Sequence, residues 1–259
     1  MNDGLFPGPS GEKNRDPMKR AQELSKRELP RKFYKDVSVK KSDSGYAILL
    51  DGKGVKTPAR HQLIVCSDQI ANVLVEEWKS QSEFIDPATM PVTRMINSTL
   101  DGVEKARSAM CKEIGRFVGT DMLFYRASDP KRLVERQKKI WGPVVSWIEG
   151  LFEIHVVLIE GIVHQEQDLL FLEKVEQYAN SLSDFRLAGL HVLVTLMGSS
   201  VLGLAIAEQF LSADSAWEIA HLDEDWNSEL WGSDEDATER RNKRTLEMRA
   251  AALLLKFGH

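Results

Sequence analysis

The sequence is poor in cysteine, with only Cys66 and Cys111 among its 259 residues. A secreted disulfide framework or a structural zinc site needs more cysteines at closer spacing, so both are excluded and a cytoplasmic location is expected. A chain of this length buries enough surface to hold a core without a disulfide, a metal or a cofactor. We therefore predict no cofactor and no metal.

An excess of positive charge is also lacking. The 34 Lys and Arg residues face 39 Asp and Glu residues, for a formal net charge of −5. A dedicated nucleic-acid-binding protein carries a clustered basic face, so no nucleic-acid partner is predicted. Residues 1–31 are rich in Gly, Pro, Ser and charge and are predicted to form a flexible arm. Basic residues gather near its end: Lys19, Arg20, Lys26, Arg27, Arg31 and Lys32.

Long apolar runs are missing except for one candidate, residues 187–207, which carries no formal charge. Glycines and polar residues such as His191 and Thr195 dilute its apolar character, and no second segment of this kind exists. A central helix surrounded by other helices explains it better, with Gly198 and Gly203 allowing close packing. The protein is predicted not to be embedded in a membrane.

Residues 33–65 have the pattern of short antiparallel strands. Asp51-Gly52 predicts a hairpin, because both central positions of a type I′ turn need positive φ. Ser67 is placed to cap a helix whose apolar positions recur at helical spacing, so that one face can cover the sheet. Trp78 lies in the phase of that face, which favours a core role over direct contact with a partner.

The pattern beyond residue 98 is helical. Asp101 with Glu104 predicts a capping box, and further helices are predicted over 168–181, 184–208, 213–230 and 234–257. Residues 154–163 are β-branched and predict a strand or an extended link. The predicted class is α+β: a small N-terminal antiparallel β-rich domain (32–98) with a covering helix, then an all-helical C-terminal domain (99–259).

The common catalytic motifs fail at named positions. A phosphate loop ending at Gly52-Lys53 would need glycine at Ala47, and a serine nucleophile motif around Ser200 would need glycine at Leu202. No two histidines are spaced i, i+3 or i, i+4, so no helix presents a metal-binding pair. His191 is interpreted as a hydrogen-bonded core residue. These motifs therefore give no support for an enzyme, and a site assembled from residues far apart in the chain stays open.

The most unusual segment is 222–239, which places Trp226 and Trp231 among acids. Its eight acidic residues are unaccompanied by Lys or Arg between 223 and 239: Asp223, Glu224, Asp225, Glu229, Asp234, Glu235, Asp236 and Glu239. Tryptophan anchors flanked by charge are typical of a binding hot spot. The alternative places both indoles in the core and leaves the acids in water.

Five segments together resemble one protein family. In order along the chain they read RKFYKDVSV, GYAILLDGKGVKTPAR, EEWKSQSEFIDPATMPVTRMINSTLD, GTDMLFYRA and LDEDWNSELWG. The chain, over about residues 31–255, resembles the assembly chaperones of the F1 part of ATP synthase that act on its alpha subunit.

The resemblance implies a non-enzymatic, two-domain chaperone that holds the unassembled alpha subunit until a beta subunit replaces it. The acidic position of the family's Glu-x-Trp-Gly motif falls on Glu229, although the family usually has an aliphatic residue where Ser228 stands. We therefore predict a monomer that binds the alpha subunit through Glu229 with Asp225, Trp226 and Trp231.

Two other functions stay open at this stage. One is an enzyme with a site between the two domains that uses carboxylates such as Asp223, Asp225 or Glu229. The other is an RNA-associated factor that uses the basic arm, whose RNA binding would depend strongly on salt.

Overall fold

The computed structural model describes residues 29–161, 163–232 and 234–259. The predicted arm lies outside this part of the chain except for its last three residues. Contacts divide the chain into two units. The described part of the first unit comprises residues 29–33 and Gln81–Asp86. Here Lys32 N donates to Glu83 O (2.9 Å), and Ile85 N donates to Pro30 O (2.9 Å). The second unit comprises Tyr34–Ser80 and Pro87–His259. The boundary predicted between residues 98 and 99 stays a prediction.

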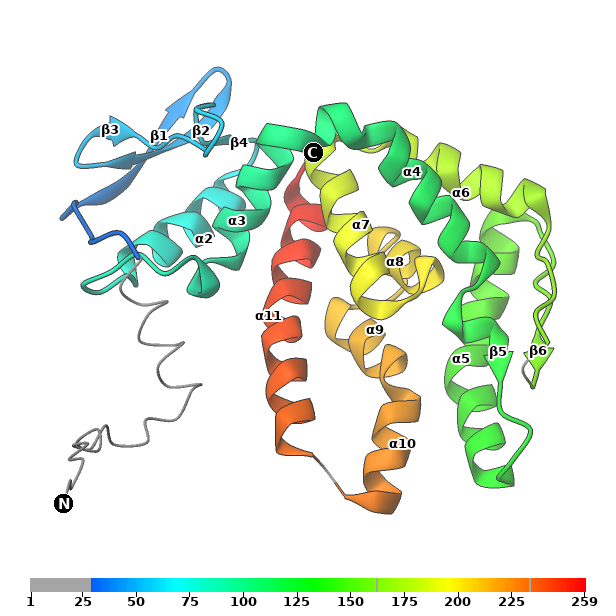
Figure 1. Ribbon diagram of the computed structural model, residues 1–259. Helices are drawn as coiled ribbons and strands as arrows, with labels where there is room; N and C mark the ends of the chain where they lie inside the picture. The colour runs from blue at the N-terminus through cyan, green and yellow to red at the C-terminus, as the bar shows by residue number, and fades with distance from the viewer. Residues whose placement is uncertain (1–28, 162, 233) are drawn as a thin grey trace, which may run out of the picture. The chain divides into compact units, whose positions relative to one another are not determined.

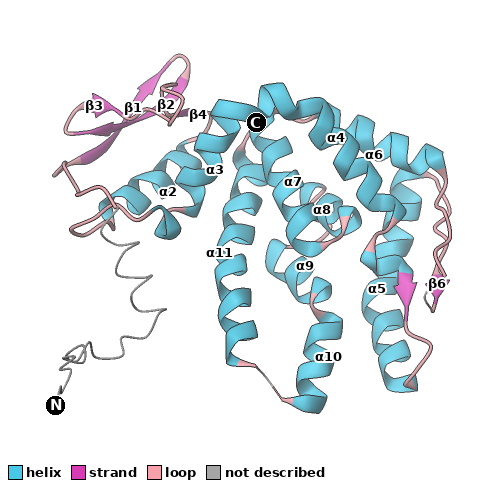
Figure 2. Ribbon diagram, in the orientation of Figure 1, coloured by secondary structure: helices cyan, strands magenta, loops and turns pink. Residues whose placement is uncertain are grey.

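A small antiparallel sheet begins the second unit (Figure 2). Its central strand is β2 (Gly45–Leu50). It pairs with each of the other three strands, β1 (Val37–Ser42), β3 (Lys53–Gly54) and β4 (Ile64–Val65). The β2–β3 turn is the predicted hairpin: φ is 47° at Asp51 and 77° at Gly52, so both central residues have the positive φ of a type I′ turn.

Helix α2 (Asp68–Lys79) covers the sheet, as predicted from its pattern. Ser67 caps it by accepting a hydrogen bond from Ile70 N (3.3 Å). Ile70 and Leu74 are fully buried on the face that contacts β1 and β2. The half-buried Trp78 ring meets Tyr34 edge-on, with 5.6 Å between ring centroids.

The predicted capping box at Asp101 is wrong. After the 3₁₀ turn η1 (Pro87–Thr89), helix α3 (Pro91–Ser98) continues through the π-helical turn η2 (Thr99–Val103) into α4 (Glu104–Gly119) without a break for a cap. Asp101 instead accepts hydrogen bonds from Thr57 Oγ1 (2.5 Å) and Ala59 N (3.1 Å), so it ties the loop after β3 to the helices. Its sequence spacing matched a cap, but tertiary contacts decided its role.

The remaining chain is mostly helical, with one small parallel strand pair. Its elements are η3 (Met122–Phe124), β5 (Tyr125–Arg126), α5 (Lys131–Phe152), β6 (Ile159–Glu160), α6 (Leu169–Ser181), α7 (Asp184–Met197), α8 (Ser200–Ala207), α9 (Ala213–Ala220), α10 (Leu222–Trp231) and α11 (Glu235–Phe257). The observed class is the predicted α+β class. The extended link predicted at 154–163 contains β6, which pairs with β5.

Two predicted helices are each divided in two. The helix predicted over 184–208 ends at Gly198, which has a φ of 66°, and a new helix starts after Ser199 caps α8. Gly198 therefore ends a helix and does not serve close packing, whereas Gly203 does: a Cβ there would lie 2.9 Å from Leu190 and Val194. The helix predicted over 213–230 is divided at His221.

Helix α7 lies at the centre of the helical core, beside α11, α4 and α8 (Figure 1). Gly189 permits the approach of α11, because a Cβ there would lie 2.6 Å from the carbonyl oxygen of Ala251. His191 lies 2.9 Å from Glu113 Oε2, and its side chain keeps 25% of its exposure, so this histidine is hydrogen-bonded at the edge of the core. In the described part of the chain no helix is long and apolar enough to cross a membrane.

One carboxylate is fully buried in this core. Asp121 accepts hydrogen bonds from Ser199 Oγ (2.9 Å), Val201 N (2.9 Å) and Leu123 N (3.1 Å). It thus binds the N-terminus of α8, where the free N–H groups favour negative charge. Burial raises the pKa of Asp121 to about 6, against the lowering effect of these hydrogen bonds.

Candidate partner-binding site

The acidic tryptophan segment predicted to bind a partner is divided between two helices: residues 222–231 form α10, and Glu235, Asp236 and Glu239 begin α11. Side chains of α5 and α11 hold α10 through arginine contacts. The first contact is at Trp226, which is 7% exposed. The guanidinium carbon of Arg132 lies 5.5 Å from its ring centroid. Trp226 therefore belongs to the packed side of α10, with a cation over its ring.

Glu229 lies one turn further along α10 and faces α5. Arg136 Nη1 donates to both carboxylate oxygens of Glu229, at 2.8 Å each. The Glu229 side chain is 54% exposed and that of Arg136 is 30% exposed. An ion pair this accessible contributes about 0–1 kcal/mol to stability, so the carboxylate can exchange its partner at small cost.

Two further acids of α10, Asp225 and Asp223, bind side chains of α11 and α5. Asp225 forms an ion pair with Arg241 of α11, in which both terminal nitrogens of the guanidinium donate to the carboxylate. Asp223 accepts from the buried side-chain amide of Gln137 on α5, with 2.9 Å between Oδ1 and Nε2. These contacts set the position of α10 between its two neighbours.

The end of α10 carries apolar surface into solvent. Trp231 is 85% exposed and Leu230 is 53% exposed. Gly232 follows with a φ of 90° and ends the helix. The exposed indole, its leucine neighbour and Glu229 together offer an apolar anchor beside a carboxylate, which suits recognition of another protein surface. We call these three residues the α10 tip.

The structure thus separates the four residues predicted to bind a partner. Glu229 and Trp231 lie at the α10 tip, whereas Trp226 is buried and Asp225 is occupied by Arg241. The sequence offered no basis for separating the two tryptophans, because both lie in the same acidic segment. No group of three or more His, Cys, Asp or Glu residues suited to a metal occurs among the described residues.

Comparisons with known proteins agree on one family. The family model described as ATP12 chaperone protein matches residues 31–149. The crystal structure of Atp12 from Paracoccus denitrificans is 33% identical, with a TM-score of 0.82 over 89% of this chain and 99% of that chain. The chain belongs to the ATP12 chaperone family. It is therefore a chaperone by family.

Two further relatives extend the comparison of this ATP12-family chain. A chaperone candidate from Agrobacterium tumefaciens is 41% identical, with a TM-score of 0.82 over 93% of this chain and 91% of that chain. Protein atp12, mitochondrial, of Schizosaccharomyces pombe is 22% identical over 237 residues, which make up 87% of this chain and 81% of that protein. The solved structures cover most of the chain, whereas the family model ends within α5 and does not include α10.

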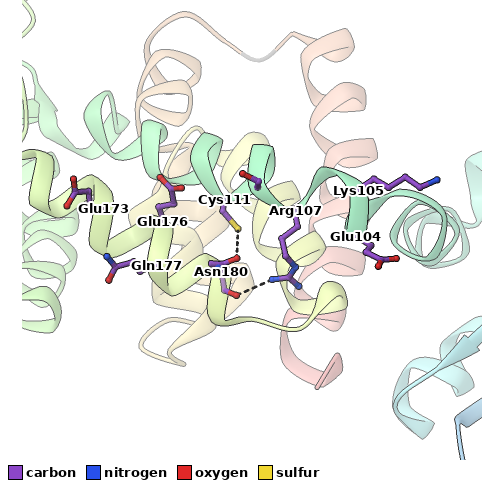
Figure 3. A pocket seen from close by; sticks show the side chains of 9 residues that line it. Glu104, Lys105, Arg107, Cys111, Glu173, Glu176, Gln177 and Asn180 are labelled. Atoms are coloured by element: carbon purple, nitrogen blue, oxygen red, sulfur yellow. Dashed lines mark hydrogen bonds between the residues drawn. The ribbon is translucent and has the colours of Figure 1, made fainter.

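A polar cavity of about 600 Å³ lies between α4 and α6 of this ATP12-family chain (Figure 3). Cys111 and Arg107 come from α4, and Asn180 lies on α6. Arg107 donates to the carbonyl oxygens of Asn180 (3.1 Å) and Leu182 (3.0 Å) and to Asp184 Oδ1 (2.6 Å). Burial raises the pKa of the Cys111 thiol, which makes it a poor nucleophile. The arginine here fastens the end of α6 to α4.

Sequence reasoning missed the cations that face α10. Arg132 and Arg136 are spaced i, i+4 on α5 and so lie on one face of that helix, which was a detectable signal. Arg241 lies sixteen residues after Asp225, and its contact depends on how α10 and α11 pack. The buried Asp121 was also missed, although it is the only acid in the quoted segment GTDMLFYRA.

Proposed function

We propose that this chain is a chaperone of F1 ATP synthase assembly that binds the unassembled alpha subunit and prevents its aggregation until beta pairs with it. Membership of the ATP12 chaperone family supports the general role. The alpha subunit as client follows from the resemblance of the five sequence segments. The fold contributes a surface on which such a client can be held.

The exposure of Trp231 is the observation that carries the proposal. A tryptophan that is 85% exposed leaves most of its large apolar surface in water, where it contributes little to the fold. An alpha subunit without its partner exposes an apolar interface of the kind that obligate complexes bury. The indole of Trp231 and the side chain of Leu230 would cover part of that interface, and Glu229 would bind a basic group at its rim.

The contact must also be reversible, because beta replaces the chaperone. A moderate apolar contact with charged groups at its edge meets this need better than maximal burial. Trp226 and Asp225 serve this surface by fixing α10: the first packs under Arg132, and the second binds Arg241. The client would then meet a helix that is already oriented.

Co-expression with the alpha subunit tests the function. We expect this chain to raise the soluble yield of alpha expressed without beta, as measured in the supernatant after centrifugation. An unchanged yield would contradict the proposal. A Trp231→Ala variant should lose much of the effect, by about 2 kcal/mol of binding free energy. Leu246→Ala, at an exposed leucine of α11, is its control.

Reversal of the charge at Glu229 tests the α10 tip more sharply. Glu229→Lys would oppose Arg136 in the free chaperone and any basic group of the client, so we expect at least a tenfold loss of affinity for alpha. The melting temperature should change by only a few degrees, because the pair is exposed. Glu239→Lys is the matched control, since it breaks the exposed ion pair with Lys243 at 2.6 Å on α11. Equal loss of fold and binding in Glu229→Lys would make Glu229 a structural residue.

A further inference from the structure

A second cavity lies beside α5, and the proposed function does not use it. Its volume is about 660 Å³, within the range of pockets that hold a ligand or a large side chain. One wall is a face of α5 with Val134, Gly142 and Val145, and the other comprises Arg126 and the extended segment from His155 to Leu158. Positions 134 and 138 lie about 200° around the helix from Arg132 and Arg136, so this cavity and the α10 contacts occupy roughly opposite faces of α5.

Arg126 is the polar group that distinguishes this cavity. Its Nη1 donates to the carbonyl oxygen of Gln137 (3.1 Å), and its guanidinium carbon lies 5.2 Å from the ring centroid of Trp141. Its Nε is buried and has no hydrogen-bond partner among the described residues. A buried N–H without an acceptor is unfavourable, and Arg126 also lines the cavity, where its guanidinium can bind an acceptor of a ligand.

The position of Arg126 is fixed by the network around Gln137. The backbone N–H of Ala127 donates to Gln137 Oε1 (2.9 Å), and Gln137 Nε2 donates to Asp223 Oδ1 (2.9 Å). Gln137 is 2% exposed, so these bonds are shielded from water. These bonds hold the Arg126 guanidinium in the cavity wall. Through its bond to Asp223, the Gln137 side chain also joins this wall to α10.

The other charged groups of the lining leave Arg126 without a direct ion pair. Glu149 accepts from Val156 N (2.9 Å) and lies 3.0 Å from His155 Nδ1, so its charge is already engaged. Lys138 and Glu160 are the remaining charged residues of the lining. Burial lowers the pKa of Arg126, and the charge of Asp223, which lies outside the lining, acts against this by a smaller amount. The guanidinium is held by its hydrogen bond to Gln137 and its contact with Trp141, and it can pair with a carboxylate of a ligand.

Exposed apolar side chains lie in the cavity-lining segment that ends at Leu158 and in the residues that follow it. Leu158 lines the cavity and is 48% exposed, and Leu170, twelve residues later, is also 48% exposed. Val163 and Leu169 between them are each 73% exposed. Exposed apolar residues concentrated in one short segment are a mark of an interaction surface.

We propose that this cavity is a second client-binding site, which takes an extended segment of the client with an aliphatic side chain next to a carboxylate. The carboxylate binds the Arg126 guanidinium, which lines the cavity, and the aliphatic group packs on Val134, Val145 and Leu158. The proposal rests on the proposed function, because it takes the occupant to be the client polypeptide. The two sites then hold the client on both sides of α5.

Filling the cavity is the first test. A Cβ at Gly142 or at Gly150, both on α5, meets nothing within 4 Å, and only Gly142 lines the cavity. Leucine favours helix more than glycine does, so neither Gly142→Leu nor Gly150→Leu should lower the melting temperature. We expect Gly142→Leu to weaken binding of alpha about tenfold and Gly150→Leu to leave it unchanged. Unchanged binding in both variants would overturn the proposal.

Cross-linking is the second test, and it separates this site from the α10 tip. A photoreactive benzophenone amino acid is placed at Ser146, an exposed position of the lining, or at Leu230 in the α10 tip. We expect both positions to capture alpha, and the fragment captured from Ser146 to carry an acid within two residues of Leu, Ile or Val. Capture from Leu230 alone would overturn the second site and leave the proposed function standing.

Two other outcomes also decide the matter. Capture from neither position, with no rise in the soluble yield of alpha on co-expression, would contradict the proposed function itself. Binding of free octanoate that Gly142→Leu abolishes, with no capture of client from Ser146, would make the cavity a small-molecule site and overturn the client proposal.

Discussion

Helices α7 and α8 differ from α10 in how they are held. Residues 187–207 carry no formal charge and are mostly buried, and Gly189 and Gly203 let neighbouring helices approach closely. Helix α10 carries acids along its length, and arginines of α5 and α11 hold it through partly exposed contacts. The first region is held by apolar packing and the second largely by charge.

The difference explains why the α10 tip suits binding. Apolar packing of the interior is lost only by unfolding, whereas an exposed ion pair is weak and can be exchanged for one with a partner. Segments that bind come from the parts of a protein that open at low cost. One residue interrupts the contrast: Asp121 places a carboxylate inside the apolar core.

The largest expected effect is therefore at Asp121. Asp121→Ala leaves Ser199 Oγ and the backbone N–H groups of Val201 and Leu123 buried without their acceptor, so we expect a loss of about 3–5 kcal/mol of unfolding free energy. Urea denaturation measures it. Asp168→Ala removes a comparable cap from α6, where Asp168 accepts from Leu170 N at an exposed site, and should cost only about 1 kcal/mol. Equal losses in the two variants would contradict the importance of burial.

The pH dependence of the same site gives a smaller effect. Burial raises the pKa of Asp121 to about 6 in the folded chain, above its value of 3.8 in an unfolded one. Because the folded state binds the proton more tightly, protonation of this carboxyl raises the free energy of unfolding as the pH falls below about 6. This contribution is lost again as the pH rises through 6. Relative to Asp121→Asn, the natural chain should gain about 1 kcal/mol between pH 7 and pH 5. A constant difference across this range would show that Asp121 does not titrate there.

The smallest effect is expected at the charged contact of α10. Arg241→Ala removes the partner of Asp225, and we expect faster hydrogen exchange of the α10 amides, by up to about fivefold, with α7 unchanged. Arg249→Ala is the control. Arg249 lies on α11, as Arg241 does, but it forms an exposed ion pair with Asp214 of α9 (3.4 Å). Loosening of α7 and α10 together would mean that the two regions form one cooperative unit.

Features that depend on neighbours in sequence were predictable. The Asp51-Gly52 hairpin and the Ser67 cap each need only a few adjacent residues, and the structure has both. The Asp101 cap failed because Thr57 and Ala59, more than forty residues earlier, bind that carboxylate. The break at Gly198 was missed because an isolated glycine in an apolar helix can serve close packing or end the helix, and its φ decides which.

The candidate site shows the same division. Composition identified the segment that carries Trp226 and Trp231, since acids flanking tryptophan are visible without a structure. Which indole faces water depends on Arg132 of α5, nearly a hundred residues earlier, which covers one of them. Similarly, no local pattern marked Arg126, whose cavity is formed by α5 and the segment after it.

The sequence by itself determined the α+β class, the Asp51-Gly52 turn, the Ser67 cap and the acidic tryptophan segment, because hydrophobic period and local capping chemistry act over a few residues. Tertiary structure decided which charges are paired, which tryptophan is exposed, and that Asp121 lies in the core. Those properties arise from contacts between residues far apart in the chain, and their free energies exist only once the helices have packed.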